Sequence, residues 1–366
     1  MPVPLVDLKA QYEAIRNDIN VAIEEVLESQ WFILGPKVGE LEEQIADYCN
    51  VKYSVGVASG SDALLLSLMA VNIGCGDEVI TTPFTFFATA GSVSRLGAKP
   101  VFVDIDPRTY NIDPQLIEEK ITDRTKAIIP VHLYGQCADM YPILEIARKY
   151  DLCVIEDAAQ AIGAKYRSRE AGSMGDLGCL SFFPTKNLGG YGDGGMILTG
   201  NEELAEKLKI LRAHGSKPKY YHSAVGCNSR LDAIQATILL TKLRYLNKWN
   251  ESRRQNAEVY NSLFADMDVV TPYSEDFNYH IYNQYVIRVK DRDKLKAFLK
   301  EKGIGTEIYY PVPLHLQECY SELGYKPGDM PVSEEASGQT LALPVYPELT
   351  REQQEEIVEL IGGFLK

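Results

Sequence analysis

Short apolar runs alternate with amphipathic stretches through the first part of the chain. The apolar runs, rich in β-branched residues, lie at 53–58, 78–82, 99–105, 126–133, 153–157, 178–183 and 195–200. Stretches with helical spacing lie between several of them: one begins near Ser61, and others cover 88–97, 113–121 and 140–150. Continuous apolar strands that alternate with helices predict a mainly parallel α/β sheet covered on both faces. Ligands of such sheets bind at the carboxyl ends of the strands.

The alternation stops after residue 200, which predicts a second unit. A long helical pattern covers 231–264 and is followed by an apparent strand at 283–289, a helix at 291–303, a strand at 306–311 and a terminal helix at 350–366. We predict a large α/β domain over residues 1–247, with an N-terminal helix included, and a smaller C-terminal α+β domain over 248–366.

Composition and charge narrow the class of protein. The 366 residues are 45% hydrophobic and carry a formal net charge of −14, so we expect no nucleic-acid partner and no attraction to anionic membranes. No apolar run approaches the ~20 residues of a membrane span, and the N-terminus lacks the apolar stretch of a signal peptide. Seven scattered cysteines without metal-ligand spacing predict reduced thiols, no metal site and a cytoplasmic location.

Two predicted strands deliver polar groups to their ends. Ser59 to Asp62 lie between a strand and an apolar helix, where they form either an ordinary helix cap or an anion site. The apolar strand before Glu156 and Asp157 places a carboxylate at its end. Asp157 either caps the next turn or holds a proton on a cationic ligand such as a pyridinium nitrogen. Gln160, three residues on, could reach a neighbouring atom of that ligand.

A third strand end carries the lysine of SFFPTKNLGGYGDGG, residues 181–195. The glycines match G-x-G-x-x-G, but the apolar run that follows them is a predicted strand, whereas a dinucleotide fingerprint must open a helix. A P-loop is excluded as well, because Lys186 precedes the glycines. Lys186 is either an exposed charge or, beside Ser181 at the end of a buried strand, a desolvated amine suited to Schiff-base chemistry.

A local basic cluster follows in an otherwise acidic chain. Residues 212–230 contain Arg212, Lys217, Lys219 and Arg230 together with aromatic residues. A solvated loop explains the two lysines, whereas Asn228 and Arg230, at the start of a long helix, are better placed for anion binding. The order of an anion-binding turn, a strand-end Asp and a lysine before glycines is that of fold-type I pyridoxal-phosphate enzymes.

The chain also resembles a known family over nearly its whole length. The segments VDLKAQY, GSDAL, PFTFFAT, PVHLYGQ, VIEDAAQAIGA, SFFPTKNLGGYGDGG, GCNSRLDAIQA and YYPVPLHLQ are similar to those of the DegT/DnrJ/EryC1/StrS sugar aminotransferases. The resemblance implies an aspartate-aminotransferase-like fold, a pyridoxal 5'-phosphate cofactor that becomes pyridoxamine 5'-phosphate in turnover, and a cytoplasmic homodimer with shared active sites.

The resemblance also implies roles for individual residues. Lys186 would carry the cofactor as a Schiff base, and Asp157 would pair with the pyridine nitrogen. The other implied cofactor contacts are Gln160 at the phenolic oxygen, Gly60, Ser61, Asp62 and Ser181 at the phosphate, Phe86 stacked on the ring, and Asn228 reaching the neighbouring subunit's phosphate. The implied substrate contacts are Arg230, which would meet a carboxylate, and Tyr221, Tyr309, Tyr310 and His315.

The implied reaction moves an amino group from L-glutamate to a keto group, at C3, of a nucleotide-linked sugar for polysaccharide or deoxyamino-sugar biosynthesis. The alternatives are amination at C4 and a non-catalytic regulator with the same fold. A uronate substrate is disfavoured because Tyr309-Tyr310-Pro311 stands where uronate-type members read His-Tyr-Pro. A dehydratase of the family is disfavoured because its members replace the lysine with histidine, and a nicotinamide oxidoreductase has only the misplaced glycine match.

Overall fold

The computed structural model describes residues 2–366 and is built on one large sheet. Its seven strands run in the order β1-β9-β8-β5-β4-β2-β3. All neighbouring strands are parallel except β9, which is antiparallel to both β1 and β8. The strands are β1 (Tyr53–Val57), β2 (Glu78–Thr81), β3 (Lys99–Phe102), β4 (Thr125–Ile128), β5 (Cys153–Asp157), β8 (Leu177–Ser181) and β9 (Gly195–Thr199). The predicted mainly parallel α/β sheet is confirmed.

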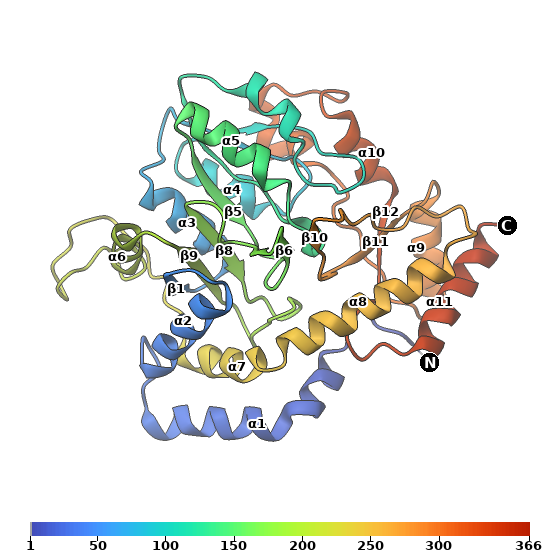
Figure 1. Ribbon diagram of the computed structural model, residues 1–366, viewed down its shortest axis with the longest axis horizontal. Helices are drawn as coiled ribbons and strands as arrows, with labels where there is room; N and C mark the ends of the chain where they lie inside the picture. Colours follow the sequence, from blue (N-terminus) through green and yellow to red (C-terminus); the bar gives the residue numbers. More distant parts are fainter. Residues whose placement is uncertain (1) are drawn as a thin grey trace.

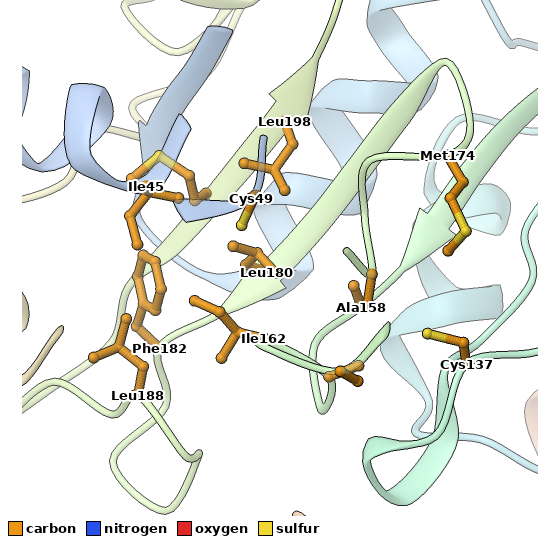
Figure 2. Packing of buried hydrophobic residues seen from close by; sticks show 14 of the residues in the cluster. Ile45, Cys49, Cys137, Ala158, Ile162, Met174, Leu180, Phe182, Leu188 and Leu198 are labelled. Carbon is orange, nitrogen blue, oxygen red and sulfur yellow. The ribbon is translucent and has the colours of Figure 1, made fainter. Parts of the chain in front are cut away.

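Helices cover both faces of this sheet, as the apolar strands require. One face packs against α3 (Gly60–Ala70), α4 (Ala88–Arg95) and α6 (Glu202–Leu211), and the other against α2 (Pro36–Tyr48), α5 (Met140–Tyr150) and α7 (Ala233–Leu243). Successive residues alternate between the two cores, since Cys179 lies in the first and Leu180 in the second. Figure 2 shows part of the second core, around Leu180 and Leu198.

Two long helices frame the large unit on one side. The N-terminal α1 (Leu8–Ser29) lies along α7, and α8 (Leu246–Leu263) runs from the end of α7 toward the C-terminal helix (Figure 1). The predicted single helix over 231–264 is therefore wrong in detail, because the chain turns between Leu243 and Leu246. None of the helices in residues 2–366 combines the length and apolarity needed to cross a membrane.

The C-terminal unit has its own apolar core. The antiparallel pair β11 (Tyr285–Arg288) and β12 (Thr340–Leu343) packs with α9 (Arg292–Glu301), α11 (Arg351–Phe364) and the second half of α8, while α10 (Pro331–Gln339) leads into β12. Val3 joins this core and bridges to Ile304, so the start of the chain lies against the C-terminal unit. The short strands β6 (Lys165–Tyr166), β7 (Arg169–Glu170) and β10 (Asn278–Tyr279) form a third sheet.

Two further predicted elements are wrong. The predicted strand 306–311 contains only one isolated bridge, from Glu307 to Ala342, because the two tyrosines that follow turn toward a cavity instead of continuing the pairing. The predicted helix 113–121 consists of two short 3-10 turns, Pro114–Leu116 and Glu118–Lys120. The domain boundary near residue 247 stays a prediction.

Candidate active site

A cavity of about 640 Å³ opens at the carboxyl ends of the large sheet. The ends of β5 and β8, the first turn of α3 and residues 307–310 of the C-terminal unit all contribute to its lining. The cavity lies where parallel α/β sheets bind ligands. Nine of the predicted site residues line it: Gly60, Ser61, Phe86, Asp157, Gln160, Ser181, Lys186, Tyr309 and Tyr310.

Lys186 lies in the turn that follows β8. The Lys186 N–H donates to the Phe183 carbonyl at 2.9 Å, which holds the turn close to the strand end. Burial lowers the pKa of the Lys186 amine to about 8, against the attraction of the Asp157 carboxylate, which raises it. A large share of this amine is thus neutral near pH 8, and a neutral amine is what attack on a carbonyl group requires.

Asp157 ends β5 and faces the same cavity. One carboxylate oxygen accepts from the Thr89 hydroxyl at 2.8 Å, and the other accepts from the Ala159 N–H at 3.2 Å. Because Thr89 gives its proton to Asp157, the Thr85 hydroxyl, 3.0 Å away, must donate to Thr89. Burial raises the pKa of Asp157, and the Thr89 hydrogen bond lowers it in part. A cation in the cavity would favour the ionised carboxylate further.

Glu156, one residue earlier, points to the other side of β5 and is fully buried. Its carboxylate accepts from the N–H groups of Gly172, Met174 and Gly175 at 2.5 to 2.8 Å and lies 2.7 Å from His132 Nε2. His132 Nδ1 accepts from the Ala138 N–H, so Nε2 carries the proton toward Glu156. Glu156 is therefore an anchor of the loop before β8 and has no part in the cavity.

The first turn of α3 carries the residues of the predicted anion site. The Ser59 hydroxyl accepts from the Asp62 N–H at 3.1 Å, while the preceding N–H groups of the helix have no intrahelical acceptor. A Cβ atom on Gly60 would lie 2.7 Å from the Ser181 Cβ, so only glycine allows this close approach. Asp62 itself does not line the cavity, because its carboxylate accepts from the Ser229 hydroxyl at 2.7 Å.

Aromatic and amide side chains also line the cavity. The Gln160 Nε2 donates to the Tyr310 hydroxyl at 3.1 Å, and the Gln160 Oε1 accepts from the Tyr134 N–H at 2.7 Å. The Phe86 ring is 58% exposed and its centroid lies 6.3 Å from that of Tyr310. Phe86 thus offers an open aromatic face to a planar ligand.

Besides Asp62, four predicted residues lie outside this cavity. Arg230 lines a neighbouring polar pocket that shares Ser59 and Asp193 with the cavity. Asn228 is exposed, and Tyr221 is 71% exposed on the segment after α6 that projects from the molecule (Figure 1). His315 is buried elsewhere, with its Nε2 3.1 Å from a Glu334 oxygen. The structure of one chain therefore does not bring these four side chains to Lys186.

Sequence reasoning missed three kinds of contact. Thr85 and Thr89 belong to the PFTFFAT segment, in which the sequence indicated a role for Phe86 alone. Ser229, which joins the α7 region to Asp62, lies between two residues that drew attention for anion binding. Glu307 and Gln284 reach the cavity from the C-terminal unit, and no residue pattern marks that contact.

These groups fit pyridoxal phosphate. The free amides of α3 and the Ser181 hydroxyl suit a phosphate, Phe86 suits an aromatic ring, Asp157 suits a pyridinium nitrogen, and the Lys186 amine suits the aldehyde. The absence of a side chain on Gly60 lets the first turn of α3 lie close to Ser181, which brings the helix amides and the Ser181 hydroxyl together.

The comparisons with known proteins agree with this fit. Residues 13–362 match the model of the DegT/DnrJ/EryC1/StrS aminotransferase family. A Geobacillus stearothermophilus protein named "Pleiotropic regulatory protein" is 55% identical, with 100% of this chain and 99% of that protein covered. The UDP-2-acetamido-2-deoxy-3-oxo-D-glucuronate aminotransferase of Pseudomonas aeruginosa is 46% identical, with 95% and 96% covered. Other relatives are transaminases or aminotransferases of UDP- or dTDP-linked 3-amino sugars.

Solved structures give the same result. The crystal structure of DesV from S. venezuelae, in complex with a ketimine intermediate, superposes with a TM-score of 0.97 at 41% identity and covers 100% of this chain and 99% of that one. A structural neighbour from Bacillus subtilis contains the cofactor PMP. The fold, the lysine and aspartate at one cavity and the family match together show that this chain belongs to the DegT/DnrJ/EryC1/StrS aminotransferase family and works with pyridoxal phosphate.

Proposed function

We propose that the protein transfers the amino group of L-glutamate to the C3 keto group of a nucleotide-linked sugar. The observation that carries the proposal is the convergence of Lys186, Asp157 and the α3 N-terminus on one cavity. The position on the sugar rests on the relatives, several of which have names that specify a 3-oxo or 3-amino sugar.

Each residue has a definite task in this reaction. When bound, pyridoxal phosphate supplies an electron sink for the C–H bond that is broken. Asp157 keeps a proton on the pyridine nitrogen, and the α3 amides with Ser181 hold the phosphate. Lys186 anchors the cofactor at rest. In turnover the Lys186 Nζ would take up and return the proton of the substrate carbon.

We also propose that two copies of the chain share their active sites. Trp31, Phe32, Ile33 and Leu34 are consecutive and 36–61% exposed, which is typical of a surface that another protein covers. Asn228 is exposed and Arg230 lies just outside the cavity, which supports a role for both across such an interface. Asn228 would then reach the partner's cofactor phosphate, and Arg230 a substrate carboxylate.

The test uses the glutamate-treated enzyme and a panel of nucleotide sugars. L-glutamate should remove the visible absorption of the bound cofactor, and the correct keto sugar should restore it. The panel holds 3-keto and 4-keto sugars on UDP and on dTDP, with and without a C6 carboxylate. Restoration by 4-keto sugars alone would refute C3 amination in favour of C4.

A regulator with the same fold is the second candidate, because the relative with 55% identity has a regulatory name. A regulator predicts that L-glutamate leaves the visible absorption of the bound cofactor unchanged, so that the keto sugars have no lost absorption to restore. The retained Lys186 and Asp157 favour catalysis, since a ligand sensor needs no amine with a lowered pKa.

A further inference from the structure

Three buried asparagines form a chain of hydrogen bonds behind Lys186. Asn283 Nδ2 donates to Asn187 Oδ1 at 2.8 Å, and Asn187 Nδ2 donates to Asn250 Oδ1 at 2.6 Å. Asn250 Nδ2 then donates to the Ile162 carbonyl at 3.2 Å. The three residues, which we call the asparagine chain, are 3%, 2% and 7% exposed for Asn187, Asn250 and Asn283.

The orientation of the asparagine chain follows from its end point. A main-chain carbonyl only accepts, so the nitrogen of Asn250 must face Ile162 and its oxygen must face Asn187. By the same reasoning, the nitrogen of Asn187 faces Asn250 and its oxygen faces the nitrogen of Asn283. Each amide therefore has one arrangement that satisfies its neighbours, and a linear series of this kind strengthens each bond through the next.

The asparagine chain joins the parts of the fold that make up the active site. Asn187 is the residue after Lys186, and Ile162 follows Gln160 on the segment that leaves β5. Asn250 belongs to α8, which packs against both apolar cores. Asn283 precedes Gln284, which lines the cavity, and leads into β11 of the C-terminal unit.

Neighbouring contacts make this connection rigid. Ile162 and Leu188 have their side chains in one apolar core (Figure 2). The segment after β5 and the segment after Lys186 are therefore packed together. The buried Arg253, one turn of α8 further on, donates to the carbonyls of Tyr282 and Asn283 at 3.3 Å each. The segment that carries Asn283 is thus fixed to α8, and a shift of the C-terminal unit would be transmitted to Asn187.

We propose that the asparagine chain is a positioning site for Lys186, which ties the place of its amine to the position of the C-terminal unit. The proposal rests on Lys186 being the reacting amine. None of the three asparagines lines the cavity, so their role is indirect. A displacement of about 1 Å at a reacting group costs up to a hundredfold in rate, so the loss of one amide should be visible in the chemistry.

The experiment compares Asn187→Ala, Asn250→Ala and Asn283→Ala with Asn256→Ala as a matched control. Asn256 lies on the same helix and also loses a hydrogen bond, to the Tyr346 carbonyl at 2.8 Å, but that bond is remote from Lys186. Each holoenzyme is titrated with pH while the visible absorption of the lysine-bound cofactor is followed. The rate and the concentration dependence of the absorption change with L-glutamate are measured as well.

We expect the three variants to move the pH midpoint of the absorption and to slow the reaction with glutamate by roughly tenfold or more, with its half-saturating concentration within about twofold of the parent value. The control should leave the midpoint and the rate unchanged. Parent-like midpoints and rates in variants that lose thermal stability as the control does would overturn the proposal and reduce the asparagine chain to a structural role.

A milder variant keeps the test decisive if an alanine variant fails to fold. Asn283→Ser removes the amide donor at the least buried end of the asparagine chain, and it should give the same change in pH midpoint. Failure of the asparagine proposal leaves the proposed reaction intact, because the transfer to keto sugars would persist. Transfer that persists in Lys186→Ala would instead refute the role of the lysine itself.

Discussion

Lys242 lies beneath the turn that carries Lys186 and is only 1% exposed. Its Nζ donates to the Gly189 carbonyl at 2.7 Å and lies 4.4 Å from the centroid of the Tyr191 ring. Burial lowers the pKa of Lys242 from 10.5 to about 8. The substitution Lys242→Met keeps the length and the apolar stem of the side chain but removes the charge, so it isolates the cost of burying that charge.

The lowered pKa fixes how this cost depends on pH. Between pH 8 and pH 10.5 the unfolded chain binds a proton at Lys242 that the folded chain has lost, so the free energy of unfolding of the parent protein rises with pH. Burying the Lys242 charge costs about 3 kcal/mol of the free energy of unfolding at pH 7, and this cost falls by about 2 kcal/mol by pH 9.5. The stability advantage of Lys242→Met over the parent should therefore shrink by about 2 kcal/mol across that interval.

Urea unfolding of both proteins at pH 7.0, 8.0, 9.0 and 9.5, at one protein concentration and equal cofactor loading, measures this difference. Other titrating groups are common to both proteins and cancel. The bond to Gly189 is stronger from the charged than from the neutral amine, but that difference is already contained in the lowered pKa, so its loss adds an offset and no further slope. Lys248→Met, at an exposed position of α8, is the control for removing a lysine that is not buried. Parallel curves for the parent and Lys242→Met would refute the reasoning.

Three further predictions concern the site. Lys186→Ala should lose turnover while its urea midpoint stays near the parent value, and borohydride reduction should no longer label the chain; turnover that persists would contradict this. Asn228→Ala should raise the dissociation constant of the cofactor, measured by fluorescence, and an unchanged constant or an active monomer would argue against a shared site. Thr89→Val removes the hydroxyl that lowers the pKa of Asp157, so the acidic limb of the pH–rate profile should move to higher pH and activity below the optimum should fall by roughly tenfold; an unmoved limb would show that Thr89 does not control this carboxylate.

The sequence could predict the large sheet and the central pair of the site. Continuous apolar runs reveal buried strands, and Asp157 and Lys186 each follow such a strand at the edge where ligands bind. The same pattern gave a wrong prediction at Tyr309 and Tyr310, because the apolar run that contains them is typical of a strand although they line a cavity.

What escaped prediction depends on contacts distant in sequence. The Thr89 hydroxyl meets Asp157 only because α4 lies over the end of β5, and no local pattern marks that meeting. The strand 340–343 pairs with 285–288 across a long insertion, so its partner is invisible in the sequence. Asn228 and Tyr221 lie outside the cavity in this chain, and the roles proposed for them would need a second copy, which the pattern of one chain does not place.

The paired acids at the end of β5 make the chemistry of this protein sensitive to strand register. Glu156 satisfies three backbone N–H groups and His132 on one side of the strand, while Asp157 serves the cavity on the other. Because side chains alternate, a slip of one residue that brought Glu156 to the cavity would bring Ile155 to the loop before β8. The cavity would then receive a longer side chain, and the loop before β8 would lose its acceptor. Deletions within 153–157 should therefore abolish folding and catalysis together.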